Sequence, residues 1–331
     1  MEFKAFVGID ISKKTIDVAI HQHADTKVFV NSRKGFKEMT NWVKKCRKDP
    51  LDEVLFCFEH TGIYSVALSV YLHEIRLCFA QVPALDIKRS MGIVRGKSDK
   101  IDAQRIARYA YERRETILPS TLACPKVRKL QVYMTLRTTL VRQRASLEAT
   151  AKEQRLVYCD KEYQDIFRAY KKVSDTLHKQ IEQLQLKMLT IIKSDQDLEQ
   201  NFRLATSVIG IGQFTVTYIL VCTNNFQRFE TWRKFACYCG TAPFEYSSGT
   251  SIRGKTKVHH FANREIKSLL FMCAMNAIKF DGELRKYYQR RLEQGKCKMS
   301  TLNIIKNKLI ARIFSAVNRK TPFVKLDMLQ G

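Results

Sequence analysis

Four acidic residues stand where metal-dependent chemistry could be built. Asp10 and Glu59 each end an apolar, strand-like run, and Asp99 and Asp102 lie three residues apart at the expected start of a helix. Residues three apart share one face of a helix. Carboxylates converging from rigid elements suit a hard divalent cation such as Mg²⁺. Taken singly, Asp99 or Asp102 could instead cap the helix. All four together would repel one another without a metal, which makes a purely structural role for the set unattractive.

The composition indicates which substrate such a metal site would act on. The chain of 331 residues carries 58 Lys and Arg against 32 Asp and Glu, a net charge of +26. This imbalance favours a polyanionic partner, most simply nucleic acid, with an anionic membrane surface as the rival. Phosphodiester transfer needs a nucleophile, charge relief and a stabilised leaving group, and two divalent ions about 4 Å apart provide the last two.

Other classes of protein fit the sequence poorly. No apolar run is long enough to span a bilayer, and no signal peptide is evident. The ten cysteines form no C-x-x-C pair, and the seven histidines show no ligand spacing. We therefore expect reduced thiols in a cytoplasmic protein. The hydrophobic content of 45% supports real cores, and the length allows two or three domains.

The elements that must position the acids follow a definite order. Apolar patterning predicts strands over residues 3–9, 15–21, 26–31, 53–58 and 76–82. Helices are expected over 36–46, 64–73, from 84, and over 101–113. Three antiparallel strands followed by βαβ units are typical of a ribonuclease-H-like α/β domain with a mixed sheet, which we place at 1–115. A stretch with two prolines, 116–125, reads as a linker.

A long helical segment is expected next, over 126–196. Between Val127 and Ile192 there is no Gly or Pro, and apolar residues recur every three or four positions. This spacing predicts a pair of long amphipathic helices or an antiparallel coiled coil. Two uses remain open: dimerisation, or packing of a helical hairpin within its own chain.

The last region, 203–325, is expected to be mostly helical and carries a glycine motif. Gly210 and Gly212 precede an apolar helix over 214–221, as in a helix-hairpin-helix motif. Such glycines let backbone N–H groups approach a phosphate at a helix N-terminus. Many ordinary helical turns use glycine in the same way.

A serine-rich segment follows the glycine motif. Ser248 lies directly before Gly249 in an expected flexible loop over 246–251. The cations that follow it are Arg253, Lys255, Lys257 and Arg264. A hydroxyl surrounded by cations suits attack on phosphate, but an ordinary Ser/Gly turn with solvated lysines is the competing interpretation. The basic helical stretch over 285–308 is either a nucleic-acid face or a solvated surface.

Three segments carry a resemblance to a known family. GIDISK at 8–13, EHTGIY at 59–64 and KSDKIDA at 97–103 resemble the DEDD-type insertion-sequence transposases, whose relatives include the pilin-gene inverting recombinase. The likeness continues through 208–212, 229–243 and the Ser248-Gly249 pair, and covers nearly the whole chain.

The resemblance implies a complete mechanism. The N-terminal domain would be RuvC-like, with Asp10, Glu59, Asp99 and Asp102 (the acidic tetrad) binding Mg²⁺ or Mn²⁺. The C-terminal transposase domain would supply Ser248 as a nucleophile that forms a covalent phosphoserine link to DNA. Family members are directed to target and donor DNA by a structured bridge RNA. They act as dimers or tetramers with composite sites, in a prokaryotic cytoplasm and in association with the nucleoid.

The segment after Ser248-Gly249 departs from the family pattern, so the resemblance does not establish cationic phosphate contacts there. The segment 257–263 lacks a glycine that the family usually has, and Lys267 stands where Arg is common.

The alternative functions are a site-specific invertase of the same family and a RuvC-like structure-specific endonuclease that uses water. A non-enzymatic nucleic-acid assembly protein is a third, but a pure binder gains nothing from four clustered anions near phosphate.

Overall fold

The computed structural model describes residues 3–47, 50–60, 62–90, 99–158, 161–248, 252–258 and 262–324. For residues 99, 245–248 and 252–257 only the backbone is described. The chain forms two compact units, residues 1–122 and 123–331. Each unit is described by itself.

The first unit is built on a five-stranded mixed sheet with the order β3-β2-β1-β4-β5. The strands are β1 (Ala5–Ile11), β2 (Thr15–Ile20), β3 (Thr26–Val30), β4 (Val54–Glu59) and β5 (Phe79–Val82). The first three pair antiparallel, and β4 runs parallel to both β1 and β5. This confirms the predicted meander followed by crossover units, and it is consistent with a RuvC-like domain.

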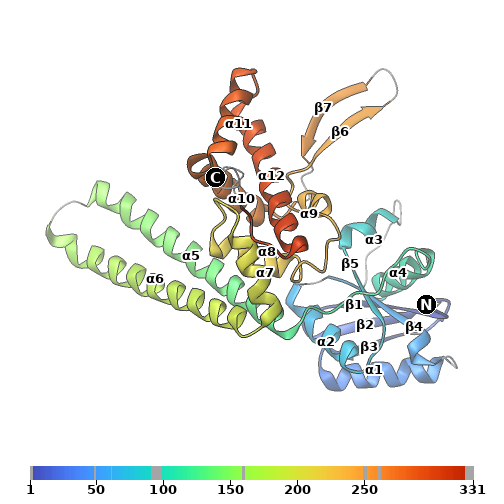
Figure 1. The fold of residues 1–331 in the computed structure, drawn as a ribbon. Helices are drawn as coiled ribbons and strands as arrows, with labels where there is room; N and C mark the ends of the chain where they lie inside the picture. The colour runs from blue at the N-terminus through green and yellow to red at the C-terminus, as the bar shows by residue number, and fades with distance from the viewer. Residues whose placement is uncertain are drawn as a thin grey trace. The chain divides into compact units, whose positions relative to one another are not determined.

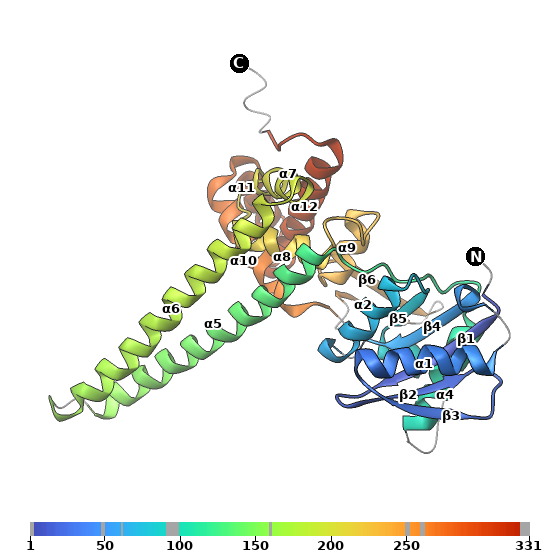
Figure 2. The same cartoon turned by 90° about the horizontal axis from the view of Figure 1, so that it is seen from below.

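Helices cover both faces of this sheet (Figures 1 and 2). α1 (Arg33–Cys46) and α2 (Val66–Glu74) share one core with the inward residues of the strands. α3 (Ala84–Ser90) and α4 (Asp99–Glu112) share a second core on the opposite face. Short 3₁₀ turns at Leu51–Glu53 and Gly62–Ser65 precede β4 and α2. β1, β2 and β4 are buried on both faces, whereas the edge strand β3 buries Phe29 and leaves Val28 and Val30 exposed.

The second unit begins with two long helices, α5 (Pro125–Val157) and α6 (Gln164–Lys193), which lie side by side as a hairpin with the 3₁₀ turn Lys161–Tyr163 between them (Figures 1 and 2). These match the expected pair of long helices, and α6 is the amphipathic one of the two. Along α6 the buried residues Ile181, Leu184, Met188 and Ile192 follow the three–four spacing.

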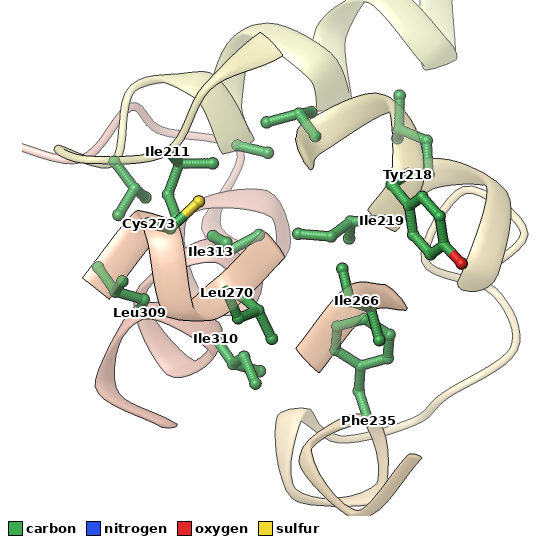
Figure 3. Close-up of a cluster of buried hydrophobic side chains, with 14 of the residues drawn as sticks. Ile211, Tyr218, Ile219, Phe235, Ile266, Leu270, Cys273, Leu309, Ile310 and Ile313 are labelled. Carbon is green, nitrogen blue, oxygen red and sulfur yellow. The ribbon is translucent and has the colours of Figure 1, made fainter. Parts of the chain in front are cut away.

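A helical body completes the second unit. It contains α7 (Gln196–Thr206), α8 (Gln213–Cys222), α9 (Trp232–Tyr238), α10 (Arg264–Phe280), α11 (Gly282–Glu293) and α12 (Lys298–Arg319). Figure 3 shows its core, where Ile219, Phe235, Leu270 and Ile310 come together from four helices. No helix in the described parts of the chain is long and apolar enough to cross a membrane.

One expectation for this unit was wrong in part. The sequence suggested a flexible loop over 246–251, but residues 246–248 belong to β6 (Pro243–Ser248), which pairs antiparallel with β7 (Ile252–Val258). Residues 249–251 lie outside the described residues. Phe, Tyr, Thr, Ile and Val alternate with polar residues through this stretch, a pattern that favours strands. The Ser and Gly residues drew the interpretation towards a loop.

Candidate functional site

Asp10 and Glu59 lie side by side at the carboxyl ends of neighbouring strands. The parallel register pairs Ile9 of β1 with Phe58 of β4, and both side chains belong to the core on the α1 side. Because side chains alternate along a strand, the next residues, Asp10 and Glu59, face α4. Neighbouring strands are about 4.8 Å apart, so the two half-buried carboxylates start close together.

α4 approaches this face through a glycine. A Cβ atom on Gly8 would lie 2.2 Å from both the carbonyl oxygen of Ala103 and the amide nitrogen of Ala107. Any larger residue at position 8 would displace the helix. Gly8 also lies two residues before Asp10, so the point of closest approach and the first acid are on the same face of β1.

The direction of α4 brings its first turn to Asp10. Phe6 shares a core with Ile106 and Ala110, and Gly8 lies against Ala103 and Ala107. Moving along β1 towards Asp10 therefore means moving back along α4 towards its N-terminus. Two residues of strand span about 6.6 Å and four residues of helix about 6 Å, so the turn containing residues 99–102 lies at the level of Asp10.

Asp102 is half-buried and already has a cationic partner. Its Oδ1 accepts from Nη1 of Arg105, one helical turn later, at 2.6 Å. Within the described residues, no three His, Cys, Asp or Glu side chains lie close enough together to hold a metal ion. The side chain of Asp99 is outside that description. A divalent ion bound by Asp102 would compete with Arg105 for the carboxylate.

The donor chemistry at this edge of the sheet nevertheless fits a hard divalent ion. Asp10, Glu59 and Asp102 supply only oxygen ligands, and each is carried by a regular strand or helix rather than by a loop. Mg²⁺ keeps several waters and substrate oxygens, so a few carboxylates are enough to hold it.

Asp17 is an acidic residue that the sequence interpretation missed. It is the direct cross-strand partner of Asp10 and is only 8% exposed. Ile16 and Val18 pack in the core on the α1 side, so Asp17 faces α4 together with Asp10. The available signal was the alternation of β2 combined with the tight turn at 12–14, which sets the register.

Ser248 lies at the end of β6, in the second unit. The register pairs Ser248 with Ile252 and Ser247 with Arg253, so the serine is at the tip end of the hairpin. Arg253, Lys255 and Lys257 occupy alternate positions of β7. The backbone pairing therefore brings the first of the expected cations directly across from the serine pair.

The base of this hairpin is fixed by α12. The carbonyl oxygen of buried Thr241 accepts from Nδ2 of Asn303 at 2.6 Å and from Nδ2 of Asn307 at 2.9 Å. The Thr241 hydroxyl donates to Oδ1 of Asn307 at 2.6 Å. Thr241 lies two residues before β6, so these bonds hold the incoming end of the hairpin to a core helix.

The chain that follows the β6–β7 hairpin is held by α9 and α10. Asn263 caps α10, since its Oδ1 accepts from the backbone N–H groups of Glu265 and Ile266. Its Nδ2 donates to Oη of Tyr238 at 3.0 Å, and its backbone N–H donates to the carbonyl of Tyr238. Arg264, the last of the expected cations, is exposed at the first position of α10.

The two ends also touch each other. Gly240 has φ of +65°, and a Cβ atom there would lie 2.2 Å from the Cβ of Ala262. Only glycine combines that conformation with such a close approach. The chain segments before β6 and after β7 are therefore in close contact at Gly240 and Ala262.

The structure separates the two glycines of the expected helix-hairpin-helix motif. Gly210 has φ of +87°, and a Cβ atom there would lie 2.7 Å from the amide nitrogen of Ala277 in α10, which gives Gly210 a packing role. Gly212 is the N-cap of α8, and its α-carbon faces open space. A phosphate contact at these glycines stays a prediction.

Comparison with known proteins assigns the class. Residues 7–154 match the model of the DEDD-type IS110 transposases, and residues 203–289 match "Transposase IS116/IS110/IS902 family". Between them these matches span more than half of the chain, and they define a DEDD-type transposase. The chain belongs to the IS110 transposase family, which confirms the resemblance seen in the sequence.

Curated relatives agree with this assignment. The pilin gene-inverting protein of Moraxella bovis is 27% identical over 332 residues, covering 97% of this chain and 98% of that protein. The pilin gene-inverting protein of Moraxella lacunata matches to the same extent. An insertion element IS110 protein of Streptomyces coelicolor is 32% identical over 116 residues, 35% of this chain and 28% of that protein. The family implies a DNA-processing enzyme, and DEDD-type transposases generally use divalent metal ions.

Proposed function

We propose that this protein cleaves and rejoins DNA at the ends of an insertion sequence, with divalent ions at the acidic tetrad and Ser248 as nucleophile. One observation carries the proposal. Asp10 and Glu59 lie on adjacent parallel strands and face α4, whose first turn contains residues 99 and 102. Divalent ions held there would relieve charge on the reacting phosphate and stabilise the leaving oxygen.

The serine step conserves the phosphodiester energy. Oγ of Ser248 loses its proton and forms a bond to phosphorus, while one phosphorus–oxygen bond to deoxyribose breaks. The released sugar oxygen gains a proton. Attack by a sugar hydroxyl of a second strand then reverses the step, which joins the new strand and frees the serine. No external energy source is required, because each phosphodiester bond broken is matched by an ester bond formed.

A pair of adjacent serines makes the test specific. Ser248→Ala is expected to abolish covalent protein–DNA adducts while DNA binding is retained. Ser247→Ala, one residue earlier on β6, is the matched control and keeps the adducts. Denaturing gels with labelled element ends measure both. Persistence of adducts in the Ser248 variant would overturn the serine assignment.

Two alternatives differ in substrate or nucleophile. Similarity over nearly the whole length to pilin gene-inverting proteins favours inversion of a DNA segment as the second candidate. Plasmids carrying the sites in direct or inverted orientation separate excision from inversion. The self-contained sheet of the first unit favours a RuvC-like endonuclease that uses water. That enzyme would cleave branched DNA in the Ser248→Ala variant but not in Asp10→Asn.

We further propose that a structured bridge RNA guides the protein. The net charge of +26 supports a large nucleic-acid surface, and base pairing by a guide would leave the protein to track backbone shape and charge. Sequencing the nucleic acid that copurifies with the protein tests this directly. A discrete structured RNA is expected, and its absence favours the invertase or nuclease functions. We also propose a nucleoid-associated location, because the proposed substrate is DNA.

A dimer or tetramer is part of the proposal. Large apolar side chains are exposed along the α5–α6 hairpin, among them Val132 (70%), Leu186 (64%) and Leu136 (48%), which supports contact with a second copy. If one subunit's acids act with another's serine, mixing the Asp10→Asn and Ser248→Ala chains restores activity that neither has alone. Failure of the mixture, with mixed oligomers shown to form, would place both groups in one chain.

A further inference from the structure

Lys306 is a deeply buried lysine on α12. It is 4% exposed, and its helical neighbours Leu302, Ile305 and Ile310 belong to the core of the second unit. Lysine is almost never buried to this extent unless its charge is paired. A charge in such a position requires a partner or a function.

Within the described residues, Lys306 has no carboxylate partner. The charged group that acts on it is a second cation, Lys267 of α10. Burial and this repulsion both lower the pKa of Lys306. α10 and α12 pack against each other, which places both lysines on one pair of helices, and a bound anion would relieve the cost of the buried charge on Lys306.

The same helix shows how a structural cation is treated. Arg312, 15% exposed, forms salt bridges with Asp281 at 2.7 Å and with Glu283 at 2.6 Å. Six residues earlier along α12, Lys306 has no such acidic partner within the described residues, and the charge that acts on it is that of Lys267. The contrast suggests that its counterion comes from outside the described chain.

Both lysines lie at the base of the serine hairpin. Asn303 and Asn307, which flank Lys306 on α12, hold Thr241 at the incoming end of β6. Lys267 lies one turn after Asn263, which fixes the outgoing end of β7. α10 and α12 pack against each other, and Lys267 is half-exposed, so the pair is reachable from the surface.

We propose that Lys306 and Lys267 form a binding site for one phosphate of the nucleic-acid backbone, at the base of the hairpin that carries Ser248. The anion supplies the missing charge, and the two ammonium groups hold it as point charges. Its place beside the hairpin base would fix the nucleic-acid strand relative to the serine. This inference rests on the proposed function only in taking nucleic acid as the source of the phosphate.

The test is a variant whose stability and binding change in opposite directions. Lys306→Met keeps the length of the side chain and removes the charge. We expect higher thermal stability than wild type, because a buried unpaired charge is gone. We expect binding to a random-sequence DNA duplex to weaken about five- to tenfold at low salt, with the slope of log K against log salt reduced by about one.

Matched controls separate the site from general charge loss. Lys298→Met removes the same charge from an exposed position on the same helix. Its slope of log K against log salt is expected to stay nearer to that of wild type than the slope of Lys306→Met. Lys267→Met should reproduce the binding loss, and the double variant should lose less than the product of the single effects, because both residues hold one phosphate. Fluorescence anisotropy over a salt series measures all four proteins.

Several outcomes would overturn the proposal. One is a more stable Lys306→Met variant with wild-type affinity and salt slope, and another is an equal loss in Lys298→Met. If inorganic phosphate stabilises wild type but not Lys306→Met, and DNA binding does not depend on Lys306, the site binds free phosphate instead. If Lys306→Met weakens DNA binding while wild type forms no Ser248 adduct, the phosphate site stands and the proposed function fails.

Discussion

Gly8 and Ala103 are in backbone contact, since a Cβ atom on Gly8 would lie 2.2 Å from the Ala103 carbonyl oxygen. This contact seats α4 on β1 and sets the level of residues 99–102 beside Asp10. The acidic tetrad therefore depends on a residue that has no side chain.

Gly8→Ala should separate α4 from the sheet. Overpacking of this kind costs about 1–3 kcal/mol of unfolding free energy. Metal-dependent DNA cleavage should fall further than this loss of stability explains, because two of the acids move with the helix. Urea unfolding and a cleavage assay at a temperature where both proteins are folded measure the two effects.

Gly282→Ala is the control for that experiment. Position 282 opens α11, and a Cβ atom there meets no other atom within 4 Å. We expect wild-type stability and cleavage. If Gly8→Ala behaves in the same way, the close approach is not what places α4.

The two hydrogen bonds between Thr241 and Asn307 give a second prediction. Asn307→Ala removes a donor and an acceptor from buried Thr241 and should cost about 1–3 kcal/mol. Formation of the Ser248 adduct should slow more than DNA binding weakens, because the base of the hairpin is loosened. Asn318→Ala, exposed on the same helix, should change neither. Equal rates of adduct formation in the two variants would argue that the hydrogen bonds of Asn307 do not position the hairpin.

Local patterns were enough to predict that Asp10 and Glu59 lie at one edge of the sheet. Asp10 and Glu59 end apolar runs, and the βαβ order implies that such ends meet at one edge of the sheet. Asp17 was missed because its place opposite Asp10 depends on strand register, which the sequence sets only through a three-residue turn. A shift of one residue would turn it to the other face.

The surroundings of Ser248 were harder to predict because the contacts that hold its hairpin are non-local. Thr241 and Asn307 are 66 residues apart, and no periodicity links them. Residues 246–248 were expected in a loop because serine and glycine are frequent in this stretch of the sequence. Lys306 was counted within a basic helical stretch, and only tertiary packing distinguishes it from its solvated neighbours.

A third prediction concerns the ion pair between Asp281 and Arg312. Asp281 is 3% exposed and also caps α11 by accepting from the backbone N–H of Leu284. Asp281→Asn keeps a capping oxygen but removes the charge that faces Arg312 at 2.7 Å. Breaking a hydrogen bond to a charged group should cost about 1.5–3 kcal/mol in chemical denaturation.

Glu283→Gln tests whether the outer partner matters. Glu283 pairs with the same arginine, but its side chain is 58% exposed. Surface substitutions of this kind change stability by less than about 0.5 kcal/mol. Equal losses in the two variants would show that burial of Asp281 does not set the strength of the pair.

The last prediction is a pH dependence at Asp195, the N-cap of α7. The pKa of its carboxyl group is lowered from the ordinary value of 3.8, first by the backbone N–H of Leu198 and then by Lys126. Because the folded pKa is below the unfolded one, the stabilisation is complete above the unfolded pKa. It is lost as the pH falls through the folded pKa.

Two variants separate the causes of that dependence. Asp195→Ala should cost about 1 kcal/mol at neutral pH, and the difference from wild type should shrink below about pH 4. Lys126→Met removes an ion pair of 3.2 Å but leaves the Leu198 bond at 3.1 Å, so most of the acid dependence should remain. Urea unfolding between pH 3 and 7 measures both differences. If Lys126→Met loses the acid dependence and Asp195→Ala adds nothing to it, the ion pair rather than the helix cap controls this carboxylate.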